Sequence, residues 1–279
     1  MADQLTTAPA AANVPAALPG PGVLAQIFSP FVIVLTYLGE ILVLLGQTVK
    51  AVRGGIDTRD LIEQMSSLGV NSVAIALLTT TTSGAVLALY FAPFLKQYGA
   101  ESFTGAVVAL AIARELGPVL TGVVVAARAG SAIAAEIGTM KVTEQIDALR
   151  ALAVSPIQYL VVPRVLAALL MVPLVCALAD AGGILGGTLL SQSEGVLPVV
   201  YWNSMKQFLD LSDFTRGIFK TLVFGLIIAL VGCHQGLRTR GGATEVGHAT
   251  TNAVVLSIIL IYLANFVLTY FMFSKVTTF

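Results

Sequence analysis

Residues 157–190 read IQYLVVPRVLAALLMVPLVCALADAGGILGGTLL, and only two of these side chains, Arg164 and Asp180, carry a charge. A helix that crosses a bilayer needs about 20 mostly apolar residues, so this stretch predicts a transmembrane helix. The whole chain has the same character, with 57% apolar and 11% charged residues among 279. Soluble domains contain about 25% charged residues. The composition therefore excludes a water-soluble fold and predicts an all-α membrane protein.

Four further stretches predict membrane-spanning helices, at residues 66–95, 104–127, 215–236 and 250–273. A sixth apolar stretch, 27–49, contains Pro30 and Glu40. It fits a spanning helix and an amphipathic helix lying in the membrane interface about equally well. Residues 1–22 are rich in Ala and Pro and predict a disordered tail, which leaves residues 23–279 as one domain.

The distribution of Lys and Arg between the five clear spans predicts their orientation, because cytoplasmic loops are enriched in these residues. One side has nine of them and the other has five. The first set is Lys50, Arg53, Arg59, Arg128, Lys141, Arg150, Arg164, Arg238 and Arg240, and the second is Lys96, Lys206, Arg216, Lys220 and Lys275. We therefore expect a cytoplasmic loop at 128–156 and an external segment at 191–214.

Small residues recur every fourth position in three places: from Gly105 to Gly117, from Gly122 to Gly138, and at 182–187. This spacing puts small side chains on one helix face, where two helices can approach closely. Packing within the bundle explains the pattern, and so does a symmetric seam between two copies of the chain.

The predicted cytoplasmic loop contains TEQIDALRALAVSP, residues 143–156. Thr143 fits an N-cap, and Pro156 fits a helix stop. The apolar residues Ile146, Leu149, Leu152 and Ala153 form a stripe, while Glu144, Asp147 and Arg150 project elsewhere. Such a helix could lie on lipid headgroups. Because its charge is balanced, docking to a cytoplasmic partner explains it better.

Two features place charge inside the spans, where charged residues are costly and usually functional. Arg114 and Glu115 directly precede Leu116-Gly117-Pro118, and Pro118 predicts a local break in the helix. Asp180 lies between two alanines and fits a helix–helix hydrogen bond or a proton relay. Lys220 fits a headgroup-binding role or a side chain that reaches the outer interface.

The chain has no motif for binding a nucleotide, and the dipeptide Gly-Lys of the P-loop is absent from its sequence. The two Cys and two His residues have no metal-ligand spacing, so we expect no metal and no cofactor on this chain. If ATP drives transport, it must bind to a partner subunit.

The chain resembles the MlaE/YrbE permeases of MCE-type lipid ABC transporters from about residue 60 to the C-terminus. The resemblance rests on ARELGPVLTGVVVAARAGSAIAAEIGTMKVTEQIDALRALAVSP (113–156) and on the later VPRVLA, GGILGG and FVLTYFMF. It implies five transmembrane helices preceded by an N-terminal interfacial helix, and a cytoplasmic coupling helix at 143–154. The coupling residues would be Glu144, Ile146, Asp147, Leu149 and Arg150.

The resemblance also implies a homodimer in the bacterial inner membrane. Its partners would be cytoplasmic ABC ATPase subunits that bind ATP and an MCE-domain protein outside the membrane, with a STAS-type subunit as a further candidate. The substrate would be phospholipid, moved between the inner and outer membranes.

A lipid permease needs polar groups for the head and an apolar wall for the acyl chains. The candidates for the polar part are Arg114, Glu115 and Lys220, and those for the wall are Leu116 and Leu120 together with apolar residues of the first span. The alternative function is an ion-coupled secondary transporter of an amphipathic substrate, in which Glu115 and Asp180 would relay protons. An intramembrane enzyme is disfavoured, because no nucleophile–base pair or metal-ligand cluster is evident.

Overall fold

The computed structural model describes residues 23–55 and 57–273, and all regular structure in this part of the chain is helical. The prediction of an all-α membrane protein is confirmed. The chain divides into two units, Met1–Glu40 and Ile41–Phe279, and the bundle described below belongs to the second. The tail predicted at 1–22 lies outside the described residues.

Each of the five predicted spans is a helix that is longer than the hydropathy pattern indicated. Their bounds are Thr58–Gln97, Glu101–Val142, Ile157–Ser193, Leu211–Arg238 and Ala243–Met272, and all five are long and apolar enough to cross a membrane. A sixth stretch, Leu35–Val52 in helix α1 (Val23–Val52), also qualifies by length and composition. The chain is a multi-pass membrane protein, and the interfacial position of 27–49 stays a prediction.

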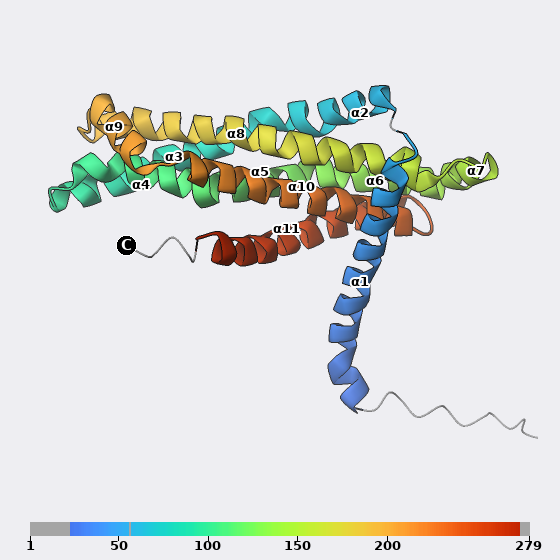
Figure 1. The fold of residues 1–279 in the computed structure, drawn as a ribbon. Helices are drawn as coiled ribbons and strands as arrows, with labels where there is room; N and C mark the ends of the chain where they lie inside the picture. The colour runs from blue at the N-terminus through green and yellow to red at the C-terminus, as the bar shows by residue number, and fades with distance from the viewer. Residues whose placement is uncertain (1–22, 56, 274–279) are drawn as a thin grey trace, which may run out of the picture. The chain divides into compact units, whose positions relative to one another are not determined.

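The helices follow one another along the chain with short π-helical turns set into the spans (Figure 1). The first span is α2 (Thr58–Met65), η1 (Ser66–Val70) and α3 (Asn71–Gln97), and the second is η2 (Glu101–Phe103), α4 (Thr104–Ala111), η3 (Ile112–Leu116), α5 (Gly117–Val125), η4 (Ala126–Gly130) and α6 (Ser131–Val142). Then come α7 (Gln145–Ala151), η5 (Ile157–Val161), α8 (Val162–Ser193), α9 (Pro198–Phe208), α10 (Leu211–Arg238) and α11 (Ala243–Phe273).

The break predicted at Pro118 takes the form of the π-turn η3, after which α5 continues the helix. Proline lacks an N–H and its ring crowds the carbonyl four residues earlier, so a wider turn before it relieves the clash. The helix therefore continues past Pro118, and the π-turn that precedes it includes Arg114 and Glu115.

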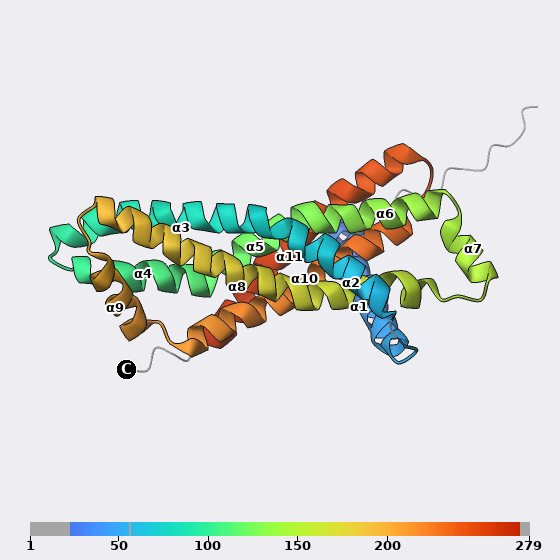
Figure 2. The ribbon, with the colours of Figure 1, turned by 90° about the horizontal axis from the view of Figure 1, so that it is seen from above.

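Glycine allows the backbones of α3 and α8 to touch along their length (Figures 1 and 2). A Cβ added to Gly84 would collide with the carbonyl oxygen of Gly183, and one added to Gly186 would collide with that of Thr81. The other predicted ladders meet this chain's own helices too, as Gly105 meets Tyr201 on α9. Packing inside the bundle thus accounts for the small-residue ladders.

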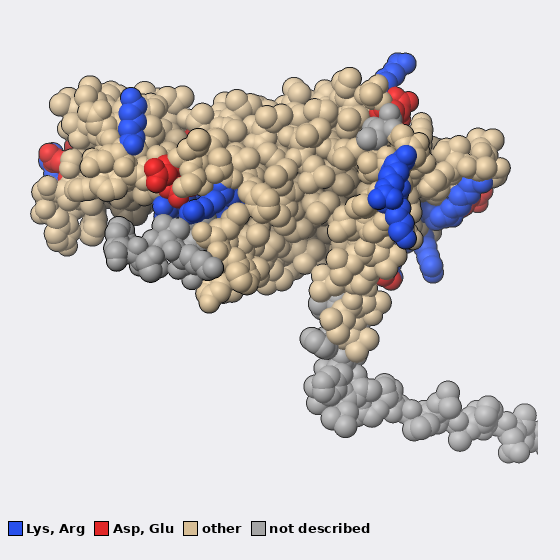
Figure 3. Space-filling view, in the orientation of Figure 1, with Lys and Arg blue, Asp and Glu red and all other residues tan. Residues whose placement is uncertain are grey.

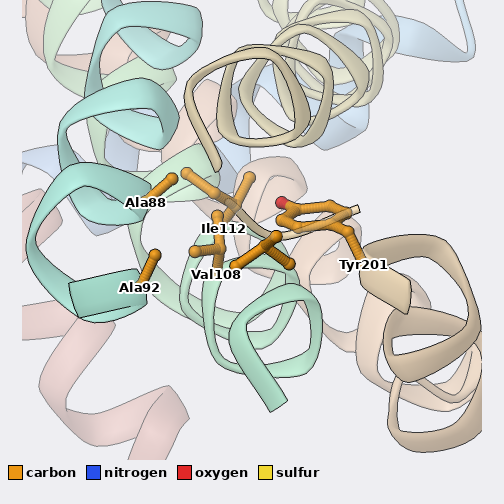
Figure 4. Packing of buried hydrophobic residues seen from close by; sticks show 6 residues of the cluster. Ala88, Ala92, Val108, Ile112 and Tyr201 are labelled. Carbon is orange, nitrogen blue, oxygen red and sulfur yellow. The ribbon is translucent and has the colours of Figure 1, made fainter. Parts of the chain in front are cut away.

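The short helix α9 is anchored by Tyr201, whose side chain is completely buried. Figure 4 shows its ring beside Val108 and Ile112, with Ala88 and Ala92 of α3 completing the cluster. Burial raises the pKa of the Tyr201 hydroxyl well above its usual range. The segment between the third and fourth spans is therefore packed against the bundle. The sequence predicted only that this segment lies on the external side.

α7 and α9 lie at opposite ends of the bundle (Figures 1 and 2). On the face shown in Figure 3, the middle of the surface is tan and shows no charged residue. Lys and Arg (blue) and Asp and Glu (red) lie toward the two ends. A wide uncharged band between charged ends is what a bilayer requires. The arrangement agrees with opposite membrane sides for α7 and α9.

Candidate functional site

The buried ammonium group of Lys220 is the centre of a polar cluster between η3, α10 and α11. Its Nζ donates hydrogen bonds to Glu115 Oε1 at 2.7 Å, to Thr269 Oγ1 at 2.8 Å and to the carbonyl oxygen of Arg114 at 2.8 Å. In an α-helix that carbonyl accepts from the N–H of residue 118, which Pro118 does not have. Lys220 is fully buried, and all three of its donors are used.

Glu115 accepts three hydrogen bonds, and its side chain is still partly exposed. Its Oε1 also accepts from Thr269 Oγ1 at 2.8 Å, and its Oε2 accepts from Asn265 Nδ2 at 2.9 Å. Its side chain is 39% exposed, whereas that of Lys220 is closed off. The carboxylate is therefore the side of the cluster that a ligand can reach.

Arg114 and Glu115 do not pair with each other, because neighbouring residues on a helix point about 100° apart. Arg114 Nη2 instead lies 3.0 Å from Asp213 Oδ1, and the Asp213 side chain is only 4% exposed. Both charges of η3 are thus matched by residues of α10. The partners belong to the same chain.

Leu116 and Leu120 lie on a different face of the same helix. With Thr82, Ser83, Val86 and Leu87 of α3, they line an open groove of about 310 Å³. The sequence predicted this pairing of Leu116 and Leu120 with the first span. The five predicted substrate residues thus meet at one π-turn but form two separate sets: a charged set toward α10 and α11, and an apolar set toward α3.

Three members of the polar cluster were not predicted: Asn265, Thr269 and Asp213. Asn265 and Thr269 lie four residues apart in the apolar helix α11, a spacing that places both on one face. That spacing was a usable signal. Asp213 lies in the first turn of α10, where an acidic residue is common for helix stability alone.

The candidate coupling helix α7 is shorter than predicted, at Gln145–Ala151. Thr143 is not its N-cap, because Thr143 donates its hydroxyl hydrogen bond back to Thr139 and closes α6. The chain turns instead at Glu144, which has a left-handed backbone with φ 62°. Glu144 is the residue that precedes the helix, and its side chain is exposed.

One side of α7 faces the protein and the other faces outward. Ile146 is completely buried, Leu149 is half-buried, and Leu152 directly after the helix is 74% exposed. Asp147 accepts from Lys141 Nζ at 3.1 Å and from Arg150 Nη1 at 2.7 Å. The hydrogen bond from Lys141 holds the pKa of the Asp147 carboxyl below its usual range. Asp147, Arg150 and Leu152 thus form a mixed surface at the end of the bundle.

The prediction that a cytoplasmic loop begins at Arg128 is wrong, because helical structure continues to Val142. Arg128 Nη1 donates to the Ser67 carbonyl at 2.9 Å and to Ser72 Oγ at 3.3 Å, so contacts with the first span satisfy its charge. Arg164, which was counted on the cytoplasmic side, is buried on α8 and pairs with Glu136 at 2.9 Å. The connection between the helices is only 143–156.

Asp180 makes no hydrogen bond or ion pair with the polar cluster in the described part of the chain. Asp180 is fully buried on α8, and its Oδ2 accepts a hydrogen bond from Cys176 Sγ at 3.7 Å. Within residues 23–55 and 57–273, no three side chains of His, Cys, Asp and Glu gather as metal ligands do. The site thus combines a charged, hydrogen-bonding cluster on one face of the helix with an apolar groove on another.

Comparison with known proteins finds relatives that match most of the chain. The family model described as Permease MlaE matches residues 61–271. A probable ABC transporter permease protein of Synechocystis is 48% identical over 80% of this chain and 85% of its own length. A probable ABC transporter permease protein of Rickettsia typhi is 44% identical over 77% and 83%. The Arabidopsis thaliana protein TRIGALACTOSYLDIACYLGLYCEROL 1, chloroplastic, is 40% identical over 83% and 67%.

Proposed function

This chain belongs to the MlaE permease family and is the permease of an ABC transporter, and from that premise we propose that it moves phospholipid between the inner and outer membranes of a bacterium. The observation that carries the proposal is the π-turn η3, which presents a charged cluster and an apolar groove on two faces of one helix. A phospholipid has the same division into a charged head and apolar chains. The Arabidopsis relative, which is named after a glycerolipid, supports a lipid substrate.

In this mechanism the head group meets Glu115, the exposed member of the cluster, and displaces part of its contact with Lys220. The acyl chains lie along Leu116 and Leu120 in the groove beside α3. Lys220 is the fixed countercharge for Glu115, and Arg114 with Asp213 holds the other side of the turn in place. A head group that carries both a phosphate and an amine can replace both partners of the Glu115–Lys220 pair.

The energy for transport comes from ATP that is bound and hydrolysed on a separate subunit, because the sequence has no P-loop. We assign docking of that subunit to the exposed surface of α7 and Leu152. The complete assembly is a homodimer with ATPase subunits at the α7 end and an MCE-domain protein at the α9 end. A STAS-type subunit is a further candidate partner.

An ion-coupled secondary transporter remains the alternative function, and one experiment separates the two. The permease is purified with its ATPase, reconstituted in vesicles, and assayed for transfer of fluorescent phospholipid to acceptor vesicles. We expect transfer that requires ATP and the second polypeptide and that persists when ionophores dissipate all ion gradients. Transfer that stops with the ionophores and proceeds without ATP would show an ion-coupled carrier.

A further inference from the structure

Asp180 is a carboxyl group in the middle of a membrane span with very little to stabilise a negative charge. None of its surface is exposed. Its Oδ2 has one partner, the thiol of Cys176 one turn earlier on α8, and a thiol is a weak donor. Its Oδ1 has no hydrogen-bond partner in the described part of the chain.

Gly117, the first residue of α5, limits the space beside Asp180 Oδ1. A Cβ added to Gly117 would collide with Asp180 Oδ1, so the carboxyl oxygen lies directly against the backbone there. Next to it Ala76, Val175 and Ala179 form an apolar core in which α3, α8 and α5 meet. A buried water needs room, and the close approach of Oδ1 to the Gly117 backbone leaves none on that side.

Countercharges are also missing around Asp180. α5 has no charged residue, α3 has Lys96 near its end, and the only other charge on α8, Arg164, pairs with Glu136. Arg114 and Glu115 of η3 pair with Asp213 and Lys220. The remaining ionisable groups on these helices and on α10 are Tyr90, Cys176, Arg216, Cys233, His234 and Arg238. Among the described residues, Cys176 alone bonds to Asp180, and no cation pairs with it.

We propose that Asp180 is a proton-binding site. Its carboxyl group holds a proton at neutral pH, and α8 packs against Gly117 with this side chain uncharged. An ionised carboxylate at this depth, with one weak donor and no cation, is far less stable than the neutral form. The bound proton therefore maintains the contact between α8 and the residue that follows η3. This inference does not depend on the proposed lipid substrate.

The proposal predicts how stability changes with pH. The folded chain holds one proton more than the unfolded chain, in which an accessible aspartate is ionised at neutral pH. Stability therefore falls as the pH rises. Relative to the Asp180→Asn variant, the unfolding equilibrium constant of the wild type rises about tenfold per pH unit, until the pH at which folded Asp180 itself ionises.

The experiment compares SDS-induced unfolding of the purified full chain in mixed micelles from mildly acidic to mildly alkaline pH. Asp180→Asn, an uncharged replacement of nearly the same shape, should fold at neutral pH and lack the wild-type dependence on pH. Asp213→Asn is the matched control, because Asp213 is nearly as buried but pairs with Arg114. It should be destabilised at neutral pH and keep the slope contributed by Asp180.

A second measurement on the wild type decides the matter even if the Asn variant fails to fold. Infrared spectra of chain labelled with ¹³C-aspartate distinguish a protonated carboxyl from a carboxylate. We expect one protonated aspartate band at neutral pH that resists brief exchange in D₂O, as a buried group does. Absence of that band, or a folded Asp180→Asn variant with the wild-type pH slope, would overturn the proposal.

Discussion

Lys220 Nζ lies 2.7 Å from Glu115 Oε1, across 105 positions of sequence, and this pair joins the π-turn of the second span to α10. The pair is asymmetric, since the Lys220 side chain is fully buried and the Glu115 side chain is 39% exposed. The two residues therefore differ in what their removal leaves behind.

The first prediction follows from that asymmetry. Glu115→Leu removes the carboxylate that pairs with a buried ammonium group and should cost about 3 kcal/mol of stability, the lower end for breaking a buried pair. Lys220→Leu should cost less, because Glu115 keeps Asn265 and Thr269 and is partly open to solvent. The double variant should be more stable than Glu115→Leu alone. Unfolding of the four proteins in SDS gives the double-mutant cycle, and strictly additive losses would show that the pair is not coupled.

The second prediction concerns docking at α7. Leu152→Asp should leave the permease folded, because the side chain is 74% exposed. It should weaken co-purification with the ATPase at least tenfold, or about 1.4 kcal/mol, because the interface must then bury an aspartate. Leu197→Asp is the matched control: Leu197 is 67% exposed beside α9, at the other end of the bundle. Equal retention of the ATPase by both variants would rule out this docking surface.

The third prediction concerns membrane sidedness. Cysteines at Gln145 on α7 and Ser193 at the end of α8 are both exposed and should react with an impermeant thiol reagent from opposite faces. The native Cys176 and Cys233 are buried and should give no background. If intact cells or oriented vesicles label both positions from one side, the topology is wrong.

The fourth prediction tests the glycine contact between α3 and α8. Gly186→Ala would drive a Cβ into the Thr81 carbonyl, which is backbone and cannot move aside, so we expect a loss of about 2 kcal/mol. Gly247→Ala is the control, because nothing lies within 4 Å of the added Cβ. A Gly186→Ala protein with the unfolding midpoint of the control would contradict the close contact.

Hydropathy predicted the existence of the five spans, since lipid demands long apolar helices whatever their partners. It misplaced the end of the second span, because Arg128 resembles the start of a loop. Arg128 lies within the helix, where it donates to the Ser67 carbonyl, 61 residues away in the sequence. The N-cap predicted at Thr143 also failed, because Glu144 takes the left-handed turn and Thr143 bonds backward to α6.

Charge inside the spans was enough to single out Arg114, Glu115 and Lys220. Their ion-pair partners could not be predicted from the sequence. Helical geometry excludes a pair between the adjacent residues Arg114 and Glu115, but it does not identify the residues that pair with them instead. The structure changes how the site must be tested. Replacing both Arg114 and Glu115 would remove the ion-pair partners of Asp213 and Lys220, two buried charges, so loss of transport in that variant would not separate a lipid site from lost stability.

The variant that removes a matched pair is therefore Glu115→Leu with Lys220→Leu, and ATP-driven transfer of fluorescent phospholipid by its reconstituted complex is the decisive measurement. The complex must first show wild-type assembly with the ATPase. The account predicts that transfer then falls at least tenfold, because the head group has lost both charges that receive it. Transfer at the wild-type rate would reduce the cluster to a structural ion pair and contradict the proposed lipid site.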